Sequence, residues 1–417
     1  MIEKYFLRKI AVIALLISGT NFGMSLLRPY DVMIRPPLKP GGIFQAAFMA
    51  EHGFNDHGFN ACGDHVNVLQ IWNGDQDALS MLNGFPVTSD QGKLAILLAA
   101  DGANNDGTRG HFKVTGDLNN NSFAVTSHVN FLDSWYFSAY LPIYNMMLKN
   151  VCWQNQTKDL SEGDQSVRQN LTNSFFKNVA ALGDGLYLGD WTRTGIGDLV
   201  LMMDWQSDFV QHKPLLKNTR VNWRLGLNLP TGLRDDENKI FAVPFGADGA
   251  YGLIFGFGLE LTYGCYVKLG GDVELQHLFG NTRCRRIKTN VDQTELLLLA
   301  KTNVYRNYGL LQRFNLWAKV CNFWGCGLQI GYQFLKRVDD SFALRSQDFS
   351  NNIANTAISL EDWTVHTAVV KLTYDFAEYL MPEAKVRPYI SLFSRVPFNG
   401  KRAAVASTIG GLIAIDF

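Results

Sequence analysis

The sequence predicts an all-β fold, an antiparallel transmembrane β-barrel of 12–14 strands, with 14 slightly preferred. Three observations lead to this prediction: several segments alternate apolar and polar residues, the links between them alternate in length, and the chain ends on Phe417. The mean hydropathy of −0.04 is too low for a bundle of transmembrane helices. Lys plus Arg and Asp plus Glu both number 38, so the charge gives no reason to expect nucleic acid as a partner.

The alternation has a period of two, which places successive side chains on opposite faces of a strand. In residues 250–263 one face is apolar from Tyr251 to Tyr263, and the other carries three glycines with Ile254, Glu260 and Thr262. Polar, glycine-rich faces suit a watery lumen better than a dry sandwich core, and aromatic residues near strand ends are typical of interfacial girdles. Each strand is about as long as a tilted bilayer crossing, roughly 9–11 residues. The pattern therefore favours a barrel in a membrane, with lipid as its partner.

Counting backward from the C-terminus gives 12 strands, separated alternately by short and long links. The segments 41–51 and 63–72 would add two more strands. In the strand at 360–375, Thr364 and His366 share a face with apolar residues, and we expect a bulge there. The 12 strands lie near residues 109–118, 121–132, 134–145, 194–206, 217–230, 250–263, 264–279, 309–320, 323–337, 360–375, 384–396 and 404–417.

The N-terminal region divides into a signal peptide at 1–25 and a segment at 26–108 that precedes the barrel core, 109–417. Residues 1–25 have the charged, apolar, small-residue order of a secretory signal, and an uncleaved anchor is the alternative. Residues 75–100 read as helix, and they either plug the barrel mouth or form a loop outside it. A second helix is expected within 164–182.

The last strand places Ile413, Ile415 and Phe417 on one face. A terminal aromatic residue preceded by apolar residues at alternate positions resembles the assembly signal of bacterial outer-membrane proteins. We therefore expect the barrel-assembly machinery as a partner and the outer membrane as the location.

The polar strand faces supply the candidate functional residues, because they point into the barrel if the apolar faces meet lipid. They carry charges of both signs, which can set a transverse field and tune the selectivity of a pore. The alternative is that these charges pair and fill a narrow lumen. The candidate pore-lining residues are Arg220, Asn222, Arg224, Lys268, Asp272, Glu274, Arg313, Lys319, Gln329, Arg387, Asp198 and Asp204.

Two short motifs in the middle of the chain resemble a known family. Residues 195–201 read GIGDLVL, and residues 223–232 read WRLGLNLPTG. They are similar to signatures of the outer-membrane proteins encoded with meta-pathway phenol degradation, relatives of the fatty-acid and aromatic-hydrocarbon transporters. The similarity covers roughly 194–262, and a wider group of porin-like proteins fits equally. The resemblance implies passive uptake of small hydrophobic or aromatic molecules. The alternative is that the motifs have only a local structural role: residues 230–232 end a strand and begin a loop, and Gly195 and Gly197 relieve crowding at the barrel rim.

Other chemistries find little support in the sequence. Ser127 and His128 lie in a predicted strand. The alternation along that strand points His128 inward, away from the lipid interface that an outer-membrane lipase would use. His52, His57 and His65 are irregularly spaced, so we expect solvated histidines and no metal or other cofactor. The six cysteines match no zinc or CxxC pattern and are expected to be wall residues, although their disulfide state stays open. We expect no enzymatic activity.

Two functions follow from these observations. The first is an outer-membrane channel or transporter for passive uptake of small solutes, hydrophobic or aromatic ones among them. The second is a structural or adhesive surface barrel with a blocked lumen. The sequence does not identify the solute, the oligomeric state or the position of residues 73–100.

Overall fold

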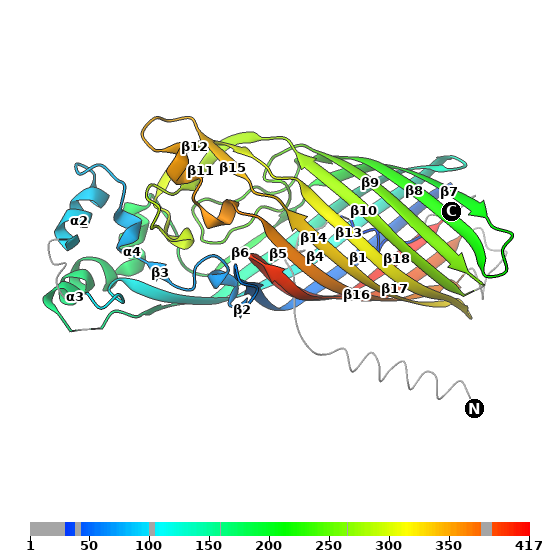
Figure 1. Cartoon of the computed structure of the whole chain (residues 1–417), viewed down its shortest axis with the longest axis horizontal. Coiled ribbons are helices and arrows are strands. Elements are labelled where there is room, and N and C mark those ends of the chain that lie inside the picture. The colour runs from blue at the N-terminus through cyan, green and yellow to red at the C-terminus, as the bar shows by residue number, and fades with distance from the viewer. Residues whose placement is uncertain (1–29, 38–42, 100–104, 159, 265, 377–385) are drawn as a thin grey trace, which may run out of the picture.

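The computed structural model describes residues 30–37, 43–99, 105–158, 160–264, 266–376 and 386–417. The predicted signal peptide at 1–25 lies outside these residues. Twelve antiparallel strands form one closed barrel (Figure 1), because β1 pairs with β18 on one side and with β4 on the other. The ring consists of β1 (Phe44–Phe59), β4 (His111–Leu132), β5 (Trp135–Asn155), β7 (Leu199–Val210), β8 (Leu216–Leu229), β9 (Gly252–Tyr263), β10 (Val267–Leu278), β13 (Leu311–Phe323), β14 (Cys326–Arg337), β16 (Trp363–Asp375), β17 (Arg387–Lys401) and β18 (Ala403–Asp416).

The preference for 14 strands is wrong, although 12 lies within the predicted range. The segments 109–118 and 121–132 are one continuous strand, β4, because the asparagines between them stay extended and pair with β5. The segment 63–72 forms only the short strand β2 (His65–Val66) and the 3-10 helix η1 (Val68–Gln70), both outside the ring. Of the segment 41–51, predicted as a strand, residues 44–51 form the first half of β1, and residues 41–42 lie outside the described residues.

The outer face of the barrel is apolar, as the alternation predicts. Exposed and buried residues alternate along the strands, and Phe255, Ile330 and Ile413 on the outer face are 54%, 57% and 53% exposed. Closure pairs the backbone of every ring strand on both sides, so this face can meet hydrocarbon without unpaired strand edges. The molecule is therefore an outer-membrane type of barrel.

The expected bulge lies in β17 rather than in the strand at 360–375. Along β16 the odd-numbered residues point inward without interruption, so His366 faces outward. Opposite it, the register with β17 jumps from Asn399 to Pro397 and leaves Phe398 as the extra residue. The outward His366 ring packs against Tyr332, whose hydroxyl lies 2.7 Å from its Nδ1. A polar residue is thus accommodated within an aromatic cluster near one end of the barrel.

The two ends of the barrel differ in the length of their connections. One end carries short turns, including the two-residue turn Trp324–Gly325, in which both residues have positive φ and so fit a type I′ hairpin. Short turns mark the periplasmic end of an outer-membrane barrel. The long connections lie at the other end, away from the C-terminus (Figure 1), and we call them together the cap.

The cap is a folded unit built from loops and from the extensions of β4 and β5 (Figure 1). Its hydrophobic core joins Leu69, Met81, Met146 and Trp191, and the rings of Phe112 and Phe175 stack at 4.1 Å. Its elements are β2, η1, β3 (Gln76–Asp77), η2 (Ser80–Leu82), α2 (Asp90–Ala99), α3 (Glu162–Val167), η3 (Arg168–Thr172), α4 (Phe175–Leu182), β6 (Trp191–Ile196), β11 (Asn281–Ile287), η4 (Glu295–Leu297), β12 (Ala300–Asn307), β15 (Ser341–Leu344), α5 (Asn351–Ala354) and η5 (Ile358–Leu360).

Both predicted helical regions belong to this cap. Within 75–100, helix occurs at η2 and α2, and within 164–182 it occurs in α3, η3 and α4. Residues 80–82 are buried in the cap core, so this region neither plugs the barrel nor hangs free as a loop. Among the described residues, no helix is long and apolar enough to cross a membrane.

A different segment, residues 30–37, lies inside the barrel, and we call it the plug segment. Met33 and Ile34 are 2% and 1% exposed and pack against Val369, Tyr389 and Phe393 on the inner wall. The expectation of a plug was therefore attached to the wrong part of the N-terminal region. Its residues show no helical or strand periodicity, and this is why the sequence pattern missed them.

Candidate functional site

Four of the candidate lumen residues form one buried charge network beside the plug segment. Arg224 is fully buried, and its Nη2 lies 3.3 Å from Asp272 and 3.6 Å from Glu274. Glu274 also pairs with Arg313 at 3.1 Å. These residues come from β8, β10 and β13, whose registers bring alternate inward positions to the same level. Paired charges can remain in such a dry location because each one offsets the other's desolvation cost.

A second network lies nearer the periplasmic turns and is more open. Arg220 pairs with Asp208 at 2.9 Å and lies 3.8 Å from Glu260, which in turn pairs with Lys268 at 3.1 Å. Asn222 belongs to the first level, because its side-chain oxygen accepts a hydrogen bond of 3.1 Å from Arg224. Lumen charges of opposite sign are thus paired in this structure.

The plug segment is held by charged groups of the inner wall. Lys371 donates hydrogen bonds to the backbone carbonyls of Ile34 at 2.7 Å and Arg35 at 3.0 Å. Arg35 forms an ion pair of 2.9 Å with Asp204 of β7. On the other side of the lumen, Asp31 lies 3.3 Å from Arg395 of β17. Ion pairs of both polarities therefore join the two: a cation of the plug segment pairs with an acid of the wall, and an acid of the plug segment pairs with a cation of the wall.

The remaining candidates lie at several different places. Gln329 donates a 3.3 Å hydrogen bond to the carbonyl of Met33 and so contacts the plug segment. Lys319 is half-buried, and Arg387 is exposed at the periplasmic end of β17. Lys371 was missed, although an inward lysine within the apolar run 369–372 is a usable signal.

A cavity of about 450 Å³ lies between the plug segment and the cap. Its floor is Tyr30, the first described residue of the plug segment, and the apolar residue Phe241 of the cap lies among its lining. The inner faces of the strands supply a mostly apolar wall at the level of the cap, and these residues are Ile254, Leu278, Leu311, Leu335 and Trp363. The cavity is therefore bounded on one side by the plug segment, which is not part of the ring, and on its other sides by strands of the ring and by the cap.

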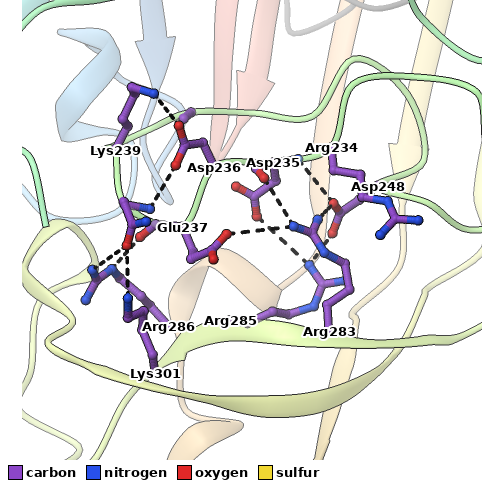
Figure 2. A network of polar contacts seen from close by, with 12 residues as sticks. Arg234, Asp235, Asp236, Glu237, Lys239, Asp248, Arg283, Arg285, Arg286 and Lys301 are labelled. Carbon is purple, nitrogen blue, oxygen red and sulfur yellow. Dashed lines mark hydrogen bonds and ion pairs between the residues drawn. The ribbon is translucent and has the colours of Figure 1, made fainter. Parts of the chain in front are cut away.

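A network of charged side chains (Figure 2) contributes several residues to the lining of this cavity, among them Asp235, Glu237 and Arg285. Acidic residues of the loop 231–249 face basic residues of β11 and β12. Arg283 and Arg285 both pair with Asp248, and Arg283 lies 3.8 Å from Glu237. Burial raises the pKa of Asp235 above its ordinary value. Burial likewise lowers the pKa of Arg286 to about 10. The loop is thus held over the cavity by charges that are partly shielded from water.

The two motifs at 195–201 and 223–232, which resemble the phenol-degradation proteins, meet at one place in the barrel wall. We call this place the joint. β6 and β7 both pair with β5, and the strand expected at 194–206 is interrupted between them at Gly197 and Asp198. Asp198 accepts hydrogen bonds from Asn228 at 2.7 Å and from the backbone N–H of Gly232 at 2.9 Å. It also accepts a hydrogen bond of 2.6 Å from the backbone N–H of Ala247. A Cβ on Gly197 would meet the Tyr144 ring at 2.5 Å, so glycine is required there. The local interpretation of the motifs therefore has a clear structural basis.

The buried His128 belongs to a polar chain that differs from a hydrolytic triad. Its Nδ1 lies 2.7 Å from Ser138 Oγ, and Ser138 donates 3.3 Å to Asp204. In a triad the imidazole lies between the hydroxyl and the carboxylate, whereas here the hydroxyl occupies the middle position. His57 and His65 contact each other at 2.8 Å. Within the described residues, no group of three or more His, Cys, Asp or Glu side chains could hold a metal ion.

The closed ring and its apolar outer band define the protein as a bacterial outer-membrane β-barrel. No protein-family model and no curated protein matches the chain. Among solved structures it is similar to the COG4313 outer membrane channel from Pseudomonas putida F1, at 13% identity, covering 93% of this chain and 100% of that one, TM-score 0.49. It is also similar to a Pseudomonas aeruginosa FadL homologue, at 9% identity over 90% and 89% of the two chains, TM-score 0.29. It is similar as well to the Ralstonia pickettii toluene transporter TbuX, at 9% identity over 90% of this chain and 89% of that one, with a TM-score of 0.32.

Proposed function

We propose that the protein is an outer-membrane channel for passive uptake of small hydrophobic or aromatic solutes. The observation that carries the proposal is the cavity of about 450 Å³ whose floor is the plug segment and not the barrel wall. A solute would enter through the cap, occupy the cavity and pass down the lumen when the plug segment moves aside.

The lining of the cavity suits this class of solute. Small-molecule sites are usually roughly 300–1,000 Å³ and mostly apolar, with a few polar groups that fix orientation. Here Ile254, Leu311 and Trp363 supply apolar wall. The polar part of the lining includes Asn228, Arg313 and further charged residues on the cap side, Asp235 and Arg285 among them. The resemblance of residues 195–201 and 223–232 to the phenol-degradation proteins implies the same solutes.

The polar contacts of the plug segment are of a kind that water can replace. They are hydrogen bonds and ion pairs to Asp204, Lys371 and Arg395, all of which would be hydrated in an open lumen. Tyr30, Met33 and Ile34 also make apolar contacts with the inner wall. Residues 30–37 contain no cysteine for a disulfide to the wall, and no strand pairing holds them. Movement of this segment requires no rearrangement of the ring itself.

The proposal is tested in liposomes that contain the full mature chain or a variant lacking residues 26–37. We expect slow flux of small solutes through the full chain and much faster flux and larger single-channel conductance through the shortened chain. The matched control is Lys93→Met, which removes a charge from an exposed position of the cap. Absence of flux and conductance in both the full and the shortened chain would overturn the proposal.

The second candidate is a structural or adhesive surface barrel with a blocked lumen. The folded core of the cap, which includes Leu69 and Phe175, favours it, because a passive channel needs no such core above its mouth. In that case removal of the plug segment would leave the membrane impermeable to small solutes, and binding to a surface would depend on cap residues.

A further inference from the structure

The side chain of Tyr30 fills a ring-sized space between the lumen and the cavity. It is 4% exposed and forms one apolar cluster with Tyr140, Val200, Met202 and Ile254. These four residues belong to the ring strands β5, β7 and β9 and not to the plug segment. The space is therefore a feature of the barrel, and Tyr30 is its present occupant.

The surroundings of the ring are those that recognise an aromatic group. The guanidinium carbon of Arg313 lies 5.4 Å from the centre of the Tyr30 ring, within the range of a cation–π contact. The Tyr140 ring lies 5.1 Å away at an interplanar angle of 40°. Aromatic pairs at such separations gain energy beyond the area that they bury. Both contacts need a π face, which a saturated group of the same size lacks.

The same space is continuous with the cavity above it. Tyr30, Val200, Ile254 and Arg313 all line the cavity as well as the ring-sized space. A molecule that has entered the cavity thus reaches the Tyr30 ring at its floor. A solute that takes the place of this ring would gain the contacts that now hold the top of the plug segment.

We propose that this space is an aromatic subsite, and that an aromatic solute and Tyr30 compete for it. The inference rests on the proposed function and specifies it: the preferred solutes carry a single aromatic ring. Because the solute and the docked plug segment exclude each other, solute binding shifts the population toward the released plug segment. The solute would in this way open its own path.

The test measures equilibrium binding of p-cresol, which is the side chain of tyrosine as a free molecule, to the purified full-length protein. Tyr30→Ala empties the subsite, and we expect roughly tenfold tighter binding than in the wild type, because no resident ring has to be displaced. Tyr30→Phe keeps a ring and should bind like the wild type. Tyr251→Ala, which removes a tyrosine from the outer face, should also leave binding unchanged. Val200→Phe added to Tyr30→Ala should abolish the gain by refilling the space.

A saturated control ligand, 4-methylcyclohexanol, separates an aromatic subsite from a simple apolar hole. It should gain little from Tyr30→Ala, since it cannot use the π contacts of Arg313 and Tyr140. Equal p-cresol binding by the wild type and Tyr30→Ala would overturn the inference, and so would an equal gain for the saturated ligand. A p-cresol gain without any flux in liposomes would keep the subsite and remove the channel function. Flux in liposomes without the gain in p-cresol binding would keep the channel function and remove the aromatic subsite.

Discussion

Arg35 provides the sharpest test of how the plug segment is held. Its guanidinium donates to Asp204 at 2.9 Å, and the two side chains are 12% and 1% exposed. Arg35→Met keeps most of the apolar stem but removes the charge. In the closed state Asp204 would then keep the hydrogen bond of 3.3 Å from Ser138 but lose its charged partner. In the open state water would hydrate the same carboxylate.

The size of the effect follows from the burial of this pair. Removal of one partner from a buried ion pair costs roughly 3–5 kcal/mol, because the other charge stays desolvated. The residual exposure of Arg35 places this pair near the lower end, about 3 kcal/mol. Since about 1.4 kcal/mol corresponds to a factor of ten, the population of the released state should rise roughly 100-fold.

Single-channel recording in planar bilayers measures this population directly as the fraction of time spent in the conducting state. We expect Arg35→Met to raise that fraction strongly and Arg35→Lys to raise it less, because lysine keeps the charge. Exchange of the two charges, Arg35→Asp with Asp204→Arg, should restore part of the closed population.

Lys93→Met is the matched control, because Lys93 pairs with Asp90 on the surface of the cap at 64% and 86% exposure. Such exposed pairs contribute about 0–1 kcal/mol, so the conducting fraction should not change. If Arg35→Met behaves like Lys93→Met, the ion pair does not hold the plug segment and the reasoning fails.

Three further predictions concern the wall, the cap and assembly. Asp198→Ala removes the acceptor shared by Asn228, Gly232 and Ala247, and should destabilise the joint by about 2–3 kcal/mol; faster proteolysis of the loop 231–249 would show it. The hydrogen bond of 2.8 Å from Arg109 holds the pKa of Asp164 below its ordinary value. Its stabilising contribution is therefore present above about pH 4 and lost as the pH falls through the lower folded pKa. Hydrogen exchange of residues 160–172, corrected for intrinsic rates, should accelerate in acid, and Arg109→Gln should flatten this dependence. Deletion of Phe417 should lower the yield of folded barrel in cell envelopes several-fold, and unchanged yield would contradict a role as assembly signal.

The period-two pattern predicted the barrel because lipid outside and polar groups inside impose opposite demands on neighbouring residues. It assigned Arg224, Asp272, Glu274 and Arg313 to inward positions, and the structure buries all four in one network. Parity along a single strand is sufficient for such an assignment. It does not reveal which charge faces which, because that depends on the register between strands.

The strand count and the place of the plug could not be obtained in the same way. Asn119, Asn120 and Asn121 look like a turn in isolation, yet pairing with β5 keeps them extended. Residues 30–37 carry no periodic signal, since their contacts combine carbonyl groups, two separated charges and the apolar side chains of Tyr30, Met33 and Ile34 in no regular spacing. A segment without regular structure is fixed only by its surroundings.

By itself, then, the sequence determined the class of fold, the faces of the strands and the residues available to the lumen, because these follow from local alternation along each strand. The tertiary structure decided that the lumen is occupied by residues 30–37, that the helices form a cap, and that Tyr30 separates the cavity from the lumen. The physical reason is that the closed ring brings residues far apart in the chain into contact, as the pair of Arg35 and Asp204 shows.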